Sequence, residues 1–178
     1  MKKIYLAGFD VFYKNAREHR KELVRICNEN GFEGLFPLDN EIDFNNKTKL
    51  EIATEIANAN KKLIQQCDII LANLSPFRGI EPDSGTVWEC GYGEALGKYI
   101  YAYSTNRRDL KEKVIEFQGL EKNAEYCKDD MFIEDFELSD NLMFADKIIA
   151  DSFIECLEII KNDFKNKKTI LKKLKKLN

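Results

Sequence analysis

The stretch DIILANLSPFRGIEPDSGTVWECGYGEALGKYIYAYST, residues 68–105, decides the fold class of this protein. It opens with a continuous apolar run at 68–74, the pattern of a strand that is buried on both faces of a parallel sheet. A loop with two prolines follows, then a helical segment at 85–97 and a second apolar run at 99–105. Strand, helix and strand in this order predict a right-handed crossover between two parallel strands.

The residues before this stretch repeat the same alternation. Short apolar strands are predicted at 3–9 and 32–38, and helices at 15–30 and 47–66, where apolar residues recur at helical spacing. The complete order predicts an α/β protein with a doubly wound parallel sheet.

The pattern is weaker beyond residue 106. Residues 107–130 are charged and loop-like, the segment MFIEDF at 131–136 is the predicted fifth strand, and residues 141–176 are predicted to be helical. We therefore expect a sheet of about five strands with helices on both faces.

The lysine-rich end of the chain differs in charge from the rest. The chain has 178 residues and a net charge of −3; residues 165–178 carry seven lysines and no acid, which leaves −10 on the remainder. We divide it into a domain at 1–164 and a helical extension at 165–178. A basic end can contact nucleic acid or a membrane, but it also suits a solvated helix C-terminus. We favour the second, without either partner, because the acidic body repels polyanions.

Composition favours a soluble cytoplasmic protein. No apolar run is long enough to span a membrane, and MKKIYLAGFD at the N-terminus predicts a strand rather than a signal peptide. The five cysteines are scattered without a CxxC pair, and His19 is the single histidine. These features favour reduced thiols over a disulfide framework or a metal site.

Two acidic residues lie where a ligand site is expected. In an open parallel sheet, ligands bind beyond the carboxyl ends of the strands, where the strand order reverses. In a flavodoxin-like order this point lies between the first and third strands, so the loops after Gly8 and Leu74 meet there, and the second loop leads to Asp83 and Glu89. The chain has no P-loop, no GxGxxG after the first strand and no GxSxG elbow, which leaves carboxylate chemistry.

The positions of these two residues indicate different roles. Glu89 falls in the first turns of the predicted helix, where the helix dipole favours a negative charge, so we expect an ionised nucleophile. Asp83 precedes that helix, and beside an anionic Glu89 we expect it to keep a proton and act as a general acid. Two carboxyl groups with these roles are typical of retaining glycosyl transfer.

Simpler alternatives remain open on the residues alone. Asp83 can be the N-cap of the helix, although Ser84 can fill that position instead. Glu89 can be a solvated helix residue. Glu94 lies about 140° further around the helix and is expected at the surface.

Several segments, in order, resemble the nucleoside 2-deoxyribosyltransferase family over residues 3–143. They are IYLAG (4–8), GLFPLDNE (34–41), CDIILANLSPFRGIEPDSGT (67–86), WECGYGEALGK (88–98) and DNLM (140–143). The resemblance implies a flavodoxin-like fold and an enzyme of nucleotide salvage that exchanges purine or pyrimidine bases on 2′-deoxyribonucleosides. It implies double displacement through a covalent deoxyribosyl-glutamate, with no metal or organic cofactor.

The resemblance also assigns catalytic residues. It implies that Glu89 attacks the anomeric carbon, that Asp83 protonates the departing base, and that Tyr5 hydrogen-bonds the nucleophilic carboxylate. Asp68 matches an acidic position that supports the site; on the residues alone, Tyr5 is a core residue and Asp68 a surface residue at a strand start.

Further positions are implied for substrate binding. Asn141 and Met143 match residues that a neighbouring subunit supplies to the sugar hydroxyls, which implies a homo-oligomer, a dimer or a hexamer; otherwise Asn141 caps the last helix and Met143 packs in the core. Phe77 or Phe12 is expected to stack on the base, and Glu41 to face it, although both phenylalanines also suit a core.

Two rival functions share the predicted fold. An N-glycosidase acting on 2′-deoxynucleoside 5′-monophosphates would need phosphate-binding groups, for which Ser75, Ser84 and Arg78 are available. DNLM favours a substrate with a free 5′-hydroxyl, and we favour transfer to a base over hydrolysis. A non-catalytic nucleotide-binding module would need no paired carboxylates. Base specificity and the choice between dimer and hexamer stay open.

Overall fold

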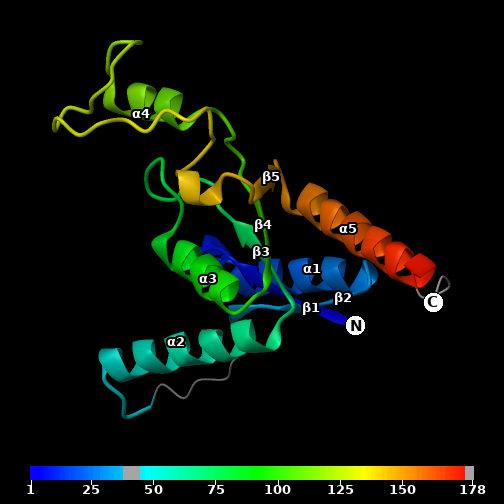
Figure 1. Ribbon diagram of the computed structural model, residues 1–178. Coiled ribbons are helices and arrows are strands. Elements are labelled where there is room, and N and C mark those ends of the chain that lie inside the picture. Colours follow the sequence, from blue (N-terminus) through cyan, green and yellow to red (C-terminus); the bar gives the residue numbers. More distant parts are fainter. Residues whose placement is uncertain (38–44, 175–178) are drawn as a thin grey trace.

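The computed structural model describes residues 1–37 and 45–174, with side chains as far as residue 166. Within these ranges, five parallel strands form one sheet in the order β2-β1-β3-β4-β5 (Figure 1). The strands are β1 (Lys2–Ala7), β2 (Phe32–Leu35), β3 (Ile69–Asn73), β4 (Tyr99–Tyr103) and β5 (Ile148–Ala150). The predicted doubly wound α/β fold is confirmed, and the strand order reverses between β1 and β3.

Helices cover both faces of this sheet. Helices α1 (Ala16–Glu29) and α5 (Phe153–Leu174) pack on one face, while α2 (Lys49–Gln66) and α3 (Ser84–Ala95) pack on the other. Alternate strand side chains point to opposite faces. Ile4 therefore joins the core under α1 and α5, whereas the next residue, Tyr5, is fully buried under α2 and α3.

Helix α3 packs closely on the sheet because of Gly93. A methyl group added at this position would overlap Cδ1 of Ile70 on β3. The missing side chain lets the helix backbone approach the strand, a common use of glycine. Gly93 thereby fixes the distance between the sheet and α3, the helix that carries Glu89.

The prediction for the fifth strand was wrong. Residues 131–136 form no strand in the described chain, apart from one isolated antiparallel bridge between Tyr126 and Phe132. The fifth strand is β5, which lies inside the segment predicted to be helical, and α5 begins only at Phe153. The outer edge of β4 is paired with β5 instead of with the segment 131–136.

Helix α4 (Leu110–Gln118) and the irregular segment after it stand apart from the sheet. Figure 1 shows them projecting beyond the helical layers, and they return to the body at the short 3₁₀ helix η3 (Leu142–Phe144). A hydrogen bond from the backbone N of Leu110 to the backbone O of Leu138 (2.8 Å) joins the start of α4 to the end of the irregular segment.

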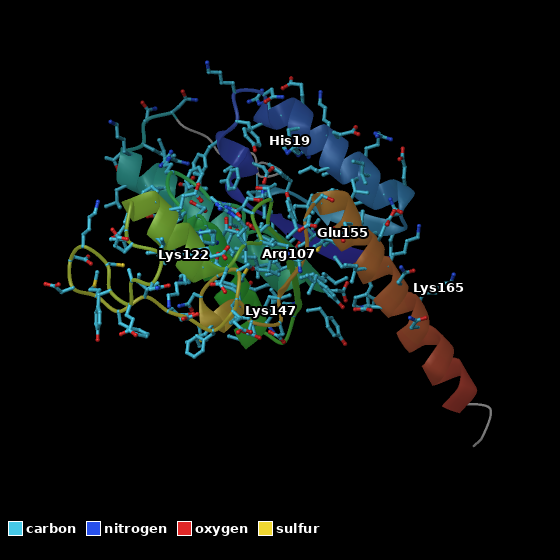
Figure 2. The ribbon with its side chains drawn as sticks, turned by 90° about the horizontal axis from the view of Figure 1, so that it is seen from above. His19, Arg107, Lys122, Lys147, Glu155 and Lys165 are labelled. Carbon is cyan, nitrogen blue, oxygen red and sulfur yellow. The ribbon has the colours of Figure 1, made fainter. Side chains whose placement is uncertain are left out.

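Helix α5 continues across the boundary expected at residue 164. Figure 2 shows its outer half, which carries Lys165, extending away from the rest of the molecule. Among the described residues, no helix is both long and apolar enough to cross a membrane.

Candidate active site

Tyr5, Asn60 and Glu89 meet between the sheet and helices α2 and α3. The hydroxyl of Tyr5 donates to Oε1 of Glu89 at 2.6 Å, and Nδ2 of Asn60 approaches the same oxygen at 3.5 Å. Tyr5 comes from the middle of β1, Asn60 from the sheet-facing side of α2, and Glu89 from the second turn of α3. The structure therefore brings together the two residues predicted as nucleophile and partner.

The pKa of Glu89 is raised from its ordinary value to about 7. Burial is the largest cause, because the charged form loses water, and the negative charge of Asp83 adds to it; the bonds from Tyr5 and Asn60 oppose the rise. Burial therefore acts against the ionised form that the position in the helix led us to expect. Glu89 is instead poised to change charge near neutral pH.

Asp83 is the N-cap of α3. Its Oδ2 accepts bonds from the backbone N and from Oγ1 of Thr86, both at 2.9 Å. The idea that Ser84 takes the cap position and leaves Asp83 free was wrong, because Ser84 is the first residue of the helix. Both described bonds involve Oδ2, and the negative charge of Asp83 contributes to the raised pKa of Glu89.

A cavity of about 570 Å³ opens over Glu89, a size typical of a small-ligand site. Its lining comes from α2 and α3: Ala53, Ile56, Ala57, Asn60, Lys61, Gly85, Trp88 and Glu89. Oδ1 of Asn60 is buried here without a hydrogen-bond partner among the described residues. Trp88 is 50% exposed and lies under the ammonium of Lys61. The cavity thus combines an apolar wall with the carboxyl group of Glu89 and the side chain of Asn60.

Asn60, Lys61 and Trp88 are residues that the sequence reasoning missed. Asn60 lies four residues after Ile56 and three before Leu63, within the apolar stripe predicted for this helix. A polar side chain in such a stripe is buried and needs a partner. That position was the available signal for Asn60.

Asp68 lies at the opposite, amino end of β3. Its carboxylate accepts bonds from Nζ of Lys2 (2.7 Å) and from the backbone N of Lys3 (2.9 Å), which lower its pKa against the effect of burial. The structure does not bring this carboxylate to Glu89. Its described contacts are those of a residue that ties β3 to β1.

Phe12 and Phe77 lie together at the switch point, the place between β1 and β3 where the strand order reverses. Phe12 belongs to η1 (Phe9–Phe12), the 3₁₀ helix after β1, and its ring stacks on Phe77 with centroids 5.5 Å apart. The guanidinium of Arg78 lies 4.5 Å from the ring centre of Phe77. These rings are absent from the described lining of the Glu89 cavity. Glu41, the other predicted base contact, lies outside the described residues.

Buried polar side chains hold the two loops of the switch point together. Oδ2 of Asp10, in η1, accepts from Nδ2 of Asn73 at 3.1 Å, and Oδ1 of Asp10 lies 2.8 Å from Nε2 of His19. Oδ1 of Asn73 in turn accepts from the backbone N of Ser75 (3.2 Å). The loops that carry Phe12 and Phe77 therefore have a common buried support.

Asn141 and Met143 lie on the other side of α3. They line a second cavity of about 530 Å³ together with Val87, Cys90, Gly91 and Glu94 of that helix. Asn141 caps η3 rather than the last helix, and Met143 is 69% exposed rather than packed in the core. Since α3 stands between them and the Glu89 cavity, they do not join Glu89 within one chain. Glu94, expected at the surface, is exposed and pairs with Lys147 at 2.9 Å.

The chain matches one known protein family over most of its length. A family model described as nucleoside 2-deoxyribosyltransferase matches residues 4–143. This chain belongs to that family. Family membership indicates an enzyme of the deoxyribosyltransferase and glycosidase type.

Individual members of the nucleoside 2-deoxyribosyltransferase family and other relatives resemble the chain to different extents. A structure of the 2-desoxiribosyltransferase from Leishmania mexicana is 34% identical, has a TM-score of 0.72, and is matched over 91% of this chain and 98% of its own. A 2-deoxyribosyltransferase from Bacillus psychrosaccharolyticus is 26% identical, with a TM-score of 0.46, over 57% of this chain and 72% of its own. An uncharacterized protein of Schizosaccharomyces pombe is 36% identical over 117 residues, 65% of this chain; the chain spans 56% of that relative's length.

Proposed function

We propose that this protein transfers 2-deoxyribose between nucleobases by double displacement through Glu89. The observation that carries the proposal is the buried Glu89 carboxyl group, which is bonded by Tyr5 and borders a ligand-sized cavity. The likeness to the Leishmania mexicana enzyme over nearly the whole of both chains supports the same reaction.

The first step forms a covalent intermediate. Glu89 attacks the anomeric carbon through a carboxylate oxygen while the bond from that carbon to the base nitrogen breaks. Both described bonds to Glu89 go to Oε1, so Oε2 is the oxygen available for attack. The bonding electrons leave with the base, and Asp83 supplies the proton that neutralises it.

The second step reverses the first with a new base. A nitrogen of the incoming base attacks the anomeric carbon, its proton passes to Asp83, and Glu89 leaves as a carboxylate. Two inversions restore the original configuration. Asp83 can serve in both steps through Oδ1, because its capping bonds occupy Oδ2.

The proposed active unit is a homo-oligomer. Asn141 and Met143 lie across α3 from the Glu89 cavity of their own chain, and Met143 is largely exposed. This placement supports their action in the site of a neighbouring subunit, where Asn141 would bind a sugar hydroxyl. The free cysteines of the described chain fit a role in nucleotide salvage in the reducing cytoplasm.

A base-exchange assay tests the proposal. The protein is incubated with 2′-deoxyinosine and adenine, and in parallel with thymidine and adenine, and the products are separated by chromatography. Deoxyadenosine is the expected product, and the two donors compare purine with pyrimidine. Release of free base without deoxyadenosine would instead establish hydrolysis. No reaction, including with 2′-deoxynucleoside 5′-monophosphates, would contradict a glycosyl-transfer enzyme of either kind.

A variant pair locates the chemistry. Glu89→Ala should abolish exchange while leaving nucleoside binding measurable by calorimetry, and Glu158→Ala, which removes an exposed carboxylate of α5 on the other face of the sheet, should retain exchange. Mass spectrometry of the wild-type protein with donor alone should detect a deoxyribosyl adduct on the peptide that contains Glu89. Retained turnover in Glu89→Ala would exclude this residue as the nucleophile.

A further inference from the structure

The carboxylate of Glu134 makes two hydrogen bonds to the segment that carries Asn141. Its Oε2 accepts from Nδ2 of the Asn141 side chain at 2.9 Å, and its Oε1 accepts from the backbone N of Leu142 at 2.6 Å. Oδ1 of Asn141 accepts from the backbone N of Met143 at 3.1 Å. Both polar atoms of the Asn141 amide are therefore engaged, and its orientation is defined.

A buried lysine supports the same segment from the other side. Lys113 of α4 is 2% exposed, and its ammonium donates to the carbonyl of Ser139 and lies 3.9 Å from Oδ2 of Asp140. Oδ1 of Asp140 accepts from the backbone N of Asn141 at 2.8 Å. Residues 139–141 are thus tied to α4 by a charged group that burial makes costly unless it is paired.

These contacts matter because Asn141 lies beside an exposed tip. Leu142 and Met143 are 47% and 69% exposed, so packing within the chain restrains them little. An unrestrained amide would rotate, and its ordering would reduce the affinity for any ligand that it binds. A carboxylate that accepts from both the amide and the next backbone N–H removes this freedom before a ligand arrives.

We propose that Glu134, supported by Lys113 and Asp140, is a positioning residue that presents Asn141 to the active site of a neighbouring subunit. The inference rests on the proposed function, because it needs a reaction in which Asn141 takes part. It assigns a catalytic purpose to α4 and the segment that follows it, which otherwise only project from the sheet (Figure 1). Glu134 acts through Asn141 and does not touch the substrate.

The primary variant is Glu134→Gln. Glutamine keeps the length of the side chain, but its NH₂ group must face either the amide of Asn141 or the N–H of Leu142, so a donor meets a donor. Base exchange should fall about 10- to 100-fold in kcat/KM, the kinetic equivalent of one charge-assisted bond. The matched control is Asp135→Asn, which removes the neighbouring carboxylate and its exposed pair with Lys111, and should leave kcat/KM within about twofold of the wild-type value.

Complementation between subunits separates positioning from a general loss of structure. Glu134→Gln and Glu89→Ala chains with different affinity tags are co-expressed, and the mixed oligomers are purified through both tags. A mixed pair contains one site in which intact Glu89 of one chain meets intact Glu134 and Asn141 of the other. In a mixed dimer one of two symmetric sites is complete, so about half of the wild-type activity should return; a hexamer should also recover activity, in proportion to its mixed pairs. The same experiment with Asn141→Ala in place of Glu134→Gln serves as the reference.

The outcomes distinguish the two proposals. Recovery in both mixtures supports the role of Glu134. Recovery with Asn141→Ala but none with Glu134→Gln, or unchanged activity of Glu134→Gln by itself, would overturn that role and leave the shared site intact. Absence of exchange in the wild-type protein, or no recovery in the Asn141→Ala mixture, would overturn the proposed function or its shared site, and the inference with it.

Discussion

The hydroxyl of Tyr5 donates a 2.6 Å hydrogen bond to Glu89, although the two residues are 84 positions apart in the chain. Tyr5 is fully buried, so its hydroxyl has no access to water and the carboxyl group of Glu89 satisfies it. The bond favours the ionised form of Glu89 in a place where burial opposes it. A nucleophilic carboxylate needs both properties: low solvation and a fixed orientation.

Replacing Tyr5 by phenylalanine should slow base exchange and move its pH dependence. Loss of a bond to a charged group predicts about a 10- to 100-fold lower kcat/KM. In the wild-type protein kcat/KM should rise with pH through about 7, because the nucleophile acts when deprotonated. In Tyr5→Phe this rise should move to higher pH, since the bond that lowers the pKa of Glu89 is gone. The control is Tyr101→Phe, which loses a 3.0 Å bond to Asp163 on the other face of the sheet. The same shift of the pH profile in this control would refute the role of Tyr5 in setting the pKa of Glu89.

Neutralising Glu89 should stabilise the fold at alkaline pH. The pKa of Glu89 is raised from 4.5 to about 7, so between these values the folded state holds a proton that the unfolded state has lost. Stability therefore falls as pH rises through this window. Glu89→Gln removes the effect and should be more stable than the wild-type protein by about 3 kcal/mol at pH 8, with little difference at pH 4.5. Urea unfolding at both pH values measures this, and equal stability at pH 8 would argue against a buried, destabilised carboxylate.

A negative charge at position 60 should raise the pKa of Glu89 further. Asn60→Asp places a second carboxylate beside Oε1, where the amide now approaches at 3.5 Å, and like charges disfavour each other's ionised form. The lower limb of the pH profile of kcat/KM should move up by about one pH unit or more. Asn58→Asp, on an exposed position of the same helix, should leave the profile unchanged. Identical profiles for both variants would mean that Asn60 does not face the nucleophile.

Two glycines of α3 should respond to alanine in opposite directions. Gly93→Ala places a methyl group against Cδ1 of Ile70, so the buried Ile70 side chain or α3 itself must shift, and the protein should lose about 1–3 kcal/mol of stability. Exchange should fall to the extent that α3, which carries Glu89, is the part that shifts. At Gly91 an added methyl group meets no atom, so Gly91→Ala should stabilise the helix by about 0.5–1 kcal/mol. Thermal unfolding of both variants measures the difference, and a stable, fully active Gly93→Ala would show that the close approach of α3 is unimportant.

The sequence by itself determined the parts of this protein that depend on local pattern. The apolar run at 68–74 and the helical spacing around it predicted β3, its crossover helix and the place of the switch point, because a strand buried on both faces leaves a continuous apolar signature. Glu89 was identified on position in the helix and on family motif together. The spacing of side chains along a single element is sufficient for such predictions.

Tertiary structure decided what depends on contacts between distant elements. Asn60 meets Glu89 only because α2 and α3 pack on the same face of the sheet. Asp68 starts the apolar run in the sequence, but its bonds to Lys2 and Lys3, and not to Glu89, follow from the pairing of β3 with β1. β5 is a strand because the backbone of β4 offers it an edge, and Glu89 has a raised pKa because neighbouring elements exclude water from it. Pairing and desolvation are properties of the assembled fold, and no single segment of the chain contains them.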